Sequence, residues 1–225
     1  MSDIIAWFAD GEHWSGSSGI PARLVEHLAI CAWAMGIALL VAIPLGIWLG
    51  HVNRFGLLVT SIGNLGRAIP TFALLILLAS WDVIGVSDLA AVIALAVFAI
   101  PPILTNAFIG VRDVDRDVTE SARGMGMKPG QVLRIVELPL AVPVLAAGIR
   151  TSTVQVVATA TLAAFVGGGG LGRLVVDGFG RQDAALMLAG VILVAALCIV
   201  LELLLGWAQR ALTPPGAHVE PQVAI

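Results

Sequence analysis

The chain has 225 residues, of which 59% are hydrophobic and only 12% are charged, and its formal net charge is −3. A soluble domain has about 25% charged residues, so this composition indicates an integral membrane protein and, without a basic patch, argues against nucleic-acid binding. The two cysteines, Cys31 and Cys198, lie in apolar runs without CxxC spacing, so we expect no disulfide.

The first three membrane spans are predicted from long apolar runs. Leu28–Gly50 has no Asp, Glu, Lys or Arg, and about 20 apolar residues suffice to cross a bilayer as a helix. No cleavable signal peptide is evident before it, so we expect this span to act as its own insertion signal. Phe55–Trp81 is interrupted only by Arg67, which predicts an irregular span with that arginine near one end. Leu89–Val111 contains Pro101-Pro102, which predicts a kinked third span.

The second half of the chain predicts two further spans. Leu138–Gly172 is interrupted only by Arg150 and ends in the glycine run Gly167–Gly172, where a turn or re-entrant loop is expected. The fourth span should therefore end before these glycines. Ala184–Gln209 carries only Glu202 and predicts the fifth span. The fold class is an all-α, polytopic transmembrane helical bundle of about five spans, or six if the second or fourth run splits.

The distribution of Lys and Arg predicts the orientation, because short cytoplasmic loops are enriched in them. With five spans and the N-terminus outside, seven basic residues fall inside and three outside. Those inside are Arg54, Arg112, Arg116, Arg123, Lys128, Arg134 and Arg210, and those outside are Arg23, Arg173 and Arg181. The expected organisation is an extracytoplasmic segment at 1–23, a transmembrane domain at 24–210 with a cytoplasmic loop at 112–138, and a short, disordered cytoplasmic tail at 211–225.

The motifs that would support an enzyme or a metalloprotein are missing from the sequence. The single lysine, Lys128, does not close a G-x-x-x-x-G-K-[ST] phosphate loop, so the chain is not expected to hydrolyse ATP by that route. There is no HExxH motif and the four histidines are scattered, so no metal site is expected. The Ser and Thr residues have no nearby base and more often bond to the backbone or a neighbouring helix. We therefore expect neither catalytic residues nor a bound cofactor.

The polar segment Glu120–Pro139 lies between apolar runs and carries a specific order of residue types. Glu120-Ser121-Ala122, three residues, Gly126, nine residues and then Val136-Glu137-Leu138-Pro139 resembles the EAA–G–I-x-LP signature of ABC importer permeases. The resemblance implies that this loop forms a short coupling helix, which docks on a separate cytoplasmic ATPase subunit. Ser121 replaces the commoner alanine of the signature, one small residue for another.

The residue types in this loop suit such a docking role. The small Ser121 and Ala122 permit a close approach, Glu120 can meet a basic group, Gly124 and Gly126 can end the helix, and Pro139 can begin the next helix. The expected coupling residues are Glu120, Ser121, Ala122, Gly124, Gly126, Leu138 and Pro139.

Other segments extend the resemblance to the osmoprotectant subgroup of binding-protein-dependent type I importer permeases. They are Asn64–Leu75, Ala99–Asn106, Gly124–Val154, Ala160–Gly172 and Leu212–Pro215. The subgroup imports glycine betaine, choline, carnitine and similar quaternary ammonium solutes. Its glycine-rich element is also found in methionine-importer permeases, so methionine stays an alternative, as does an ATP-independent channel or secondary transporter. The partners implied are cytoplasmic ATPase subunits that use ATP, a second copy or a paralogue, an extracytoplasmic binding protein and lipid of a bacterial inner membrane.

Residues on the translocation path are a separate hypothesis. Arg150 is an ionisable residue deep in the fourth span, and it could face a water-filled cavity or pair with Glu202. Trp33 lies inside a span and could hold a quaternary ammonium group, whereas most of the other tryptophans lie where an interfacial belt is expected. Phe165 and Gly168 complete the residues that we place on the path.

Overall fold

The structure, a computed structural model, describes residues 2–213 apart from the side chains of Ser2, Asp3 and Arg67. Every regular element in this part of the chain is a helix, which confirms the predicted all-α class. The elements are α1 Ser2–Ala9, η1 Gly11–Trp14, α2 Ile20–Val52, α3 Gly56–Ala68, α4 Thr71–Ala79, α5 Asp88–Arg112, α6 Arg116–Gly124, α7 Pro129–Val132, η2 Leu133–Glu137, α8 Leu138–Thr159, η3 Ala160–Val166, α9 Gly172–Arg181 and α10 Ala184–Leu212.

Four stretches of the described chain are long and apolar enough to cross a membrane, and a bent pair gives a fifth. The four are α2, α5, α10 and the continuous run from α7 to η3; α3 and α4 form the bent pair, at an angle of 77°. The predicted number of spans is therefore confirmed when the bent pair counts as one. The first span is longer than predicted, because α2 begins at Ile20, where Pro21 occupies its first turn.

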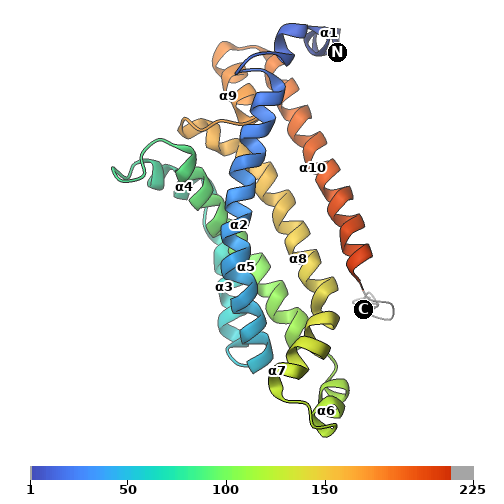
Figure 1. The fold of residues 1–225 in the computed structure, drawn as a ribbon. Helices are drawn as coiled ribbons and strands as arrows, with labels where there is room; N and C mark the ends of the chain where they lie inside the picture. Colours follow the sequence, from blue (N-terminus) through green and yellow to red (C-terminus); the bar gives the residue numbers. More distant parts are fainter. Residues whose placement is uncertain (1, 214–225) are drawn as a thin grey trace, which may run out of the picture.

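Helix α5 forms the centre of the bundle, between α2 and α8 (Figure 1). It packs closely because small residues face it. A Cβ at Gly46 of α2 would lie 2.8 Å from the Leu104 carbonyl oxygen, and one at Gly148 of α8 would lie 2.4 Å from the Asn106 Cβ. Small residues at such positions let helix backbones approach within a membrane. Helix α5 continues through Pro101-Pro102 without a break in its assigned range.

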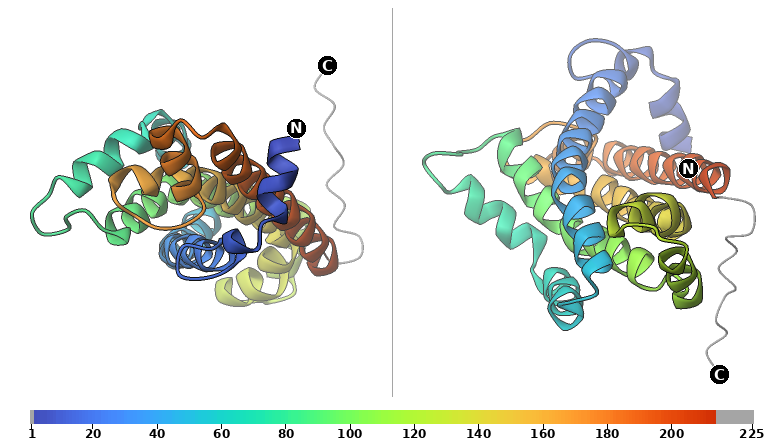
Figure 2. Two further views of the ribbon diagram at one scale, coloured as in Figure 1. Left: turned by 90° about the horizontal axis from the view of Figure 1, so that it is seen from above. Right: turned by 60° about the horizontal axis from the view of Figure 1, so that its bottom comes forward.

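The second span is broken at a proline. Ile69 is extended, with φ −72° and ψ 119°, because the ring of the following proline disfavours helical geometry at the preceding residue. Pro70 is also extended, and α4 then starts at Thr71. Figure 2 shows α3 and α4 on the side of the bundle away from α10. The expected irregularity of this span is confirmed, and the side chain of Arg67 lies outside what the structure describes.

The glycine run after η3 forms a loop that is held by carboxylates from two other helices. Gly167 and Gly170 have φ of +79° and +90°, a conformation that favours glycine. The Gly170 amide donates to Glu26 of α2 at 2.8 Å, and the Gly169 amide donates to Asp88 of α5 at 3.0 Å. The fourth span therefore ends before the glycines, as predicted. This loop lies next to α9, in the half of the bundle that also carries α1 and away from α6 and α7 (Figure 1).

Candidate functional site

Four of the predicted coupling residues lie in a short helix, α6, namely Glu120, Ser121, Ala122 and Gly124, whereas Gly126 follows it and Leu138 and Pro139 begin α8. The Asp115 side chain caps its start by accepting from the Asp117 amide at 2.8 Å. Gly124 is its last residue, and Gly126 then takes φ +87°. The amides of Met125 and Met127 donate to carbonyl groups in the last turn, which satisfies acceptors that the helix leaves open.

The two faces of α6 have different environments. Thr119 and Ala122, three residues apart, are buried, and Ala122 is only 2% exposed. Since α6 contacts α7 and η2, we infer that Ala122 is buried within this chain, and its part in coupling stays a prediction. Glu120 and Ser121 are exposed. The surface of α6 that is open to a partner therefore contains Glu120 and Ser121, and Gly124 lies exposed at its end.

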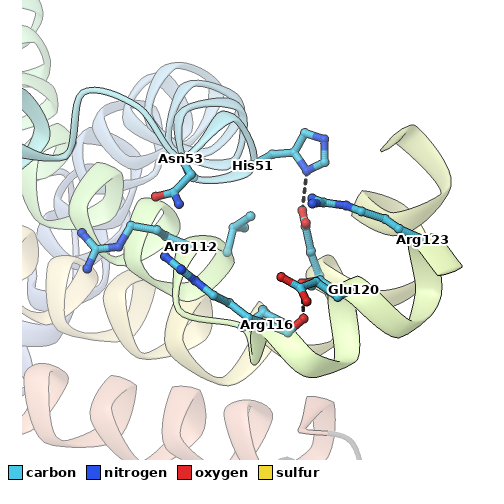
Figure 3. Close-up of a pocket in the computed structure, with 11 residues that line it drawn as sticks. His51, Asn53, Arg112, Arg116, Glu120 and Arg123 are labelled. Carbon is cyan, nitrogen blue, oxygen red and sulfur yellow. Dashed lines mark hydrogen bonds and ion pairs between the residues drawn. The ribbon is translucent and has the colours of Figure 1, made fainter. Parts of the chain in front are cut away.

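A polar cavity of about 260 Å³ lies between α6 and the adjacent ends of α2 and α5 (Figure 3). Arg116, Glu120 and Arg123 line it from α6, at the i, i+4 and i+7 positions of one helix face. None of the three forms an ion pair within 4.0 Å among the residues that the structure describes. Charges of both signs from α6 therefore line one cavity.

A buried contact joins the coupling region to the first span. Nδ1 of His51, in the last turn of α2, lies 2.5 Å from Oε2 of Glu137, at the end of η2 (Figure 3). Glu137 is only 5% exposed. Sequence reasoning did not identify this pair, because His51 had no nearby partner in sequence and Glu137 was only part of a signature. The pair gives α6, which packs on η2, a direct connection to α2.

Pro139 lies in the first turn of α8, as expected, but α8 does not follow a loop. It continues from α7 through η2, a π-helical turn in which the Leu138 amide donates to the Leu133 carbonyl. A proline has no amide hydrogen to offer the preceding turn, and widened π turns occur as local insertions in α-helices, often at functional sites. The signature residues Leu138 and Pro139 therefore mark a change of helix type, and the helix itself begins at Pro129.

Arg150 connects two membrane helices. Its guanidinium donates to Gln209 at 2.9 Å and lies 3.1 Å from a carboxylate oxygen of Glu202, both on α10. Gln209 in turn donates to the Pro143 carbonyl of α8 at 3.0 Å. The expected pairing of Arg150 with Glu202 is thus confirmed, while its place on a translocation path stays a prediction.

The other predicted path residues lie in two places. Phe165 of η3 and Gly168 of the following loop lie at the same end of the bundle, where the Gly168 amide donates to the Ala163 carbonyl at 2.9 Å. Trp33 is 70% exposed on α2. It is 15 residues from Trp48 on the same helix, or about 22 Å, so these two cannot enclose one small ligand.

Phe72 was missed by sequence reasoning. Its ring centroid lies 5.6 Å from that of Phe165, with an angle of 78° between the ring planes. Phe72 follows the break at Pro70, and a discontinuous membrane helix is a known pointer to a binding site. That break was the available signal for its position.

Comparisons with known proteins agree with this architecture. The chain matches the family described as binding-protein-dependent transport system inner membrane component over residues 42–214. It is 39% identical over 194 residues to the choline transport system permease protein OpuBB of Bacillus subtilis (strain 168), a match that covers 86% of this chain and 88% of that protein. It is 37% identical over 214 residues to the carnitine transport permease protein OpuCB of Listeria monocytogenes, which covers 95% of each.

A solved structure shares the fold. In inward-facing conformations of the MetNI methionine ABC transporter, one chain superposes with a TM-score of 0.73 at 26% identity, covering 84% of this chain and 94% of that chain. The family match and the sequence relatives both extend over most of the chain. The chain therefore belongs to the family of binding-protein-dependent transport system inner membrane components.

Proposed function

We propose that the chain is the permease subunit of an ATP-driven ABC importer and forms the translocation path for a quaternary ammonium osmoprotectant such as glycine betaine, choline or carnitine. The observation that carries this proposal is the high identity, over nearly the whole chain, to permeases named for choline and carnitine transport. These solutes share a trimethylammonium group. The substrate class is therefore defined by that group more than by any one compound.

The exposed surface of α6 is the proposed docking site for a cytoplasmic ATPase subunit. Glu120 and Ser121 face outward, Gly124 and Gly126 end the helix, and the charges of Arg116 and Arg123 line the adjacent cavity. ATP is used by the partner, and this chain supplies neither a catalytic group nor a cofactor site. Movement of the ATPase would reach α2 through η2 and the contact between His51 and Glu137. A driven conformational change needs contacts that differ between two states. The contact between His51 and Glu137 is a candidate for such a contact.

The proposed assembly contains a second permease, either another copy or a paralogue, and an extracytoplasmic substrate-binding protein. It lies in a bacterial inner membrane, with the N-terminus outside and the C-terminus in the cytoplasm. The sidedness is inferred from the distribution of Lys and Arg. The fold is compatible with it, because α1, α9 and the glycine loop lie toward one end of the bundle and α6 and α7 lie at the other (Figure 1). In the proposed division, 1–23 is extracytoplasmic, 24–210 is the permease domain with its coupling loop at 112–138, and 211–225 is a tail that from Pro214 onward lies outside the described residues.

Uptake of radiolabelled choline, glycine betaine, carnitine and methionine tests this proposal. The chain is produced with its cognate ATPase and binding protein in cells that lack other uptake systems for these solutes. We expect uptake of at least one quaternary ammonium solute, and its loss when the ATPase subunit is omitted. Uptake of methionine alone would contradict the substrate class but not the fold, and uptake without the ATPase subunit would favour a channel or secondary transporter.

A further inference from the structure

Two interruptions of membrane helices meet near the end of the bundle that holds the glycine loop. One is the break between α3 and α4 at Ile69–Pro70, and the other is the change from α8 to the 3₁₀ turn η3. The two are neighbours, because η3 contacts both α4 and α5. At membrane depth, interrupted backbone is tolerated where it is covered by protein or lines a water-filled cavity. Discontinuous helices also commonly form the substrate sites of transporters.

An aromatic pair bridges these two interruptions. Phe72 is the second residue of α4 and Phe165 is the sixth of η3, and their rings meet edge to face with centroids 5.6 Å apart. Phe72 is 41% exposed and Phe165 is 56% exposed, so part of each side chain stays accessible beside the contact. Within the described residues, the other contacts between aromatic rings involve Trp7 in the N-terminal segment. The membrane bundle thus has one such pair among its described residues, located where its helices are interrupted.

An apolar groove of about 360 Å³ adjoins Phe165. Its walls come from the end of α8, η3, α9 and α10, and include Thr161, Val175, Val194 and Cys198. Ligand sites of about 300–1,000 Å³ are typically apolar with a few placed polar groups. No charged side chain lines this groove, so a small bare cation would find no anionic partner there. A cation whose charge is covered by methyl groups would instead match an apolar wall that includes the exposed ring of Phe165. Phe72 does not line the groove, but its ring meets that of Phe165 from α4.

We propose that Phe72 and Phe165 form a transient binding site for the quaternary ammonium group of the solute on the translocation path. This inference rests on the proposed substrate class and adds a specific contact within the permease. Aromatic faces attract such cations by about 0.5–2 kcal/mol per contact, a fold-change of about 2–30 in affinity. That range suits a site from which the solute must leave again. The site would bind the methylated ammonium group of the solute and make no specific contact with the rest of the solute.

Equilibrium binding of radiolabelled choline tests the site. The assembled permease and ATPase are placed in lipid nanodiscs without the binding protein, so that binding to the permease alone is measured. Phe72→Leu and Phe165→Leu keep an apolar side chain but remove the aromatic face, and each should weaken binding about 2–30-fold. Phe165→Trp restores an aromatic face and should bind within about twofold of wild type. Phe179→Leu is the matched control, because Phe179 is 76% exposed on α9 and forms no aromatic pair among the described residues.

A neutral competitor separates attraction to the charge from simple apolar contact. The carbon isostere of choline, in which carbon replaces the quaternary nitrogen, should displace radiolabelled choline poorly from wild type, because it lacks the positive charge. The proposal is overturned if the wild-type assembly shows no saturable binding of choline, if both Leu variants bind like wild type, or if the isostere competes as well as choline. The aromatic Phe165→Trp variant shows whether a loss in the Leu variants comes from the ring or from misfolding.

Uptake by the wild-type transporter with its binding protein is measured in parallel. Wild-type uptake of a quaternary ammonium solute together with unchanged binding in the Leu variants would reject this site and leave the proposed function intact. The absence of any such uptake would reject the proposed function itself.

Discussion

At the scale of single residues, two side-chain contacts between helices stand out in a chain with few charges. His51 with Glu137 joins α2 to η2, and Arg150 with Glu202 joins α8 to α10. Removing one partner of a buried pair leaves the other charge without compensation, which is costlier than removing both. The burial argument applies to His51 with Glu137, whose side chains are 17% and 6% exposed. Arg150 with Glu202 is 35% and 45% exposed, close to the surface pair Arg112 with Asp113 at 40% and 54%, and such exposed pairs contribute about 0–1 kcal/mol in water. Arg150 and Glu202 are expected to matter more than that because both lie on helices long and apolar enough to cross the membrane.

Replacement of Glu137 by Gln tests the connection between α6 and α2. Glu137→Gln keeps the shape but removes the charge that faces His51, and we expect a loss of stability of about 1–3 kcal/mol. Uptake per ATP hydrolysed should also fall, because the connection between the docking helix and the first span is weakened. Both rates are measured in the same proteoliposomes. Asp113→Asn is the control, since Asp113 is exposed, and wild-type coupling in Glu137→Gln would contradict the proposed route.

A double-mutant cycle tests the pair in the membrane. Arg150→Ala leaves Glu202 without its partner, so it should destabilise the chain more than the double substitution Arg150→Ala with Glu202→Ala does. We expect an interaction energy of about 0.5–3 kcal/mol between the two positions, measured from thermal inactivation in detergent. Additive effects of the two substitutions would show that the contact contributes nothing to stability.

At the scale of elements, the coupling helix depends on how it ends. Gly126 adopts φ +87°, which costs other residues about 1–2 kcal/mol, although a Cβ there would meet no atom within 4 Å. Gly124, two residues earlier, also has open space but no positive φ. The two glycines thus offer a test of backbone conformation that is independent of steric contact.

Alanine at each glycine gives that test. Gly126→Ala should reduce uptake by up to about tenfold, because the end of α6 must shift to relieve a strain of about 1 kcal/mol. Gly124→Ala strains no backbone, so it should reduce uptake less than Gly126→Ala does. Membrane insertion is checked by the amount of chain that elutes as a single species in detergent. Equal uptake by the two variants would show that the geometry after α6 does not matter for coupling.

At the scale of the whole molecule, the arrangement separates two working ends. The glycine loop, α9 and α1 lie at one end, and α6 and α7 lie at the other, with the membrane helices between them (Figure 1). In the proposed assembly, a signal from an ATPase bound at α6 would have to cross the length of the bundle to affect solute entry at the other end. Helices α2 and α8 pack closely on α5 through Gly46 and Gly148. We expect such closely packed helices to move together, so that a displacement at α6 reaches the other end of the bundle.

Cysteine labelling tests the orientation of these two ends. Ser17→Cys, before α2, should react with a membrane-impermeant maleimide in intact cells, whereas Met125→Cys, after α6, should react only once the membrane is permeabilised. Both positions are exposed, and the native Cys31 is buried and Cys198 is partly buried, so background labelling should be low. The reverse pattern of labelling would contradict an extracytoplasmic N-terminus.

Local signals in the sequence account for much of the fold. The run Leu28–Gly50 identified the first span because the length of an apolar segment is a property of neighbouring residues. The loop after Val166 was likewise expected from its glycines. The break at Pro70 was not, because the irregularity of the second span was predicted from Arg67 and not from the proline. The position of α6 was predicted from the order of residue types in Glu120–Pro139. The helical turns α7 and η2, which lead into α8 without a loop, were not predicted.

What the sequence by itself determined about this protein was thus the class of the fold, the number of spans and the polar segment that contains the short helix α6, for which we propose a coupling role. The tertiary structure decided that Ala122 faces inward, that His51 contacts Glu137, and that Phe72 meets Phe165. The physical reason is that hydropathy and turn preferences act over a few neighbouring residues. Contacts between distant residues depend on how each helix is rotated about its axis and shifted against its neighbours, which only packing of the complete bundle determines.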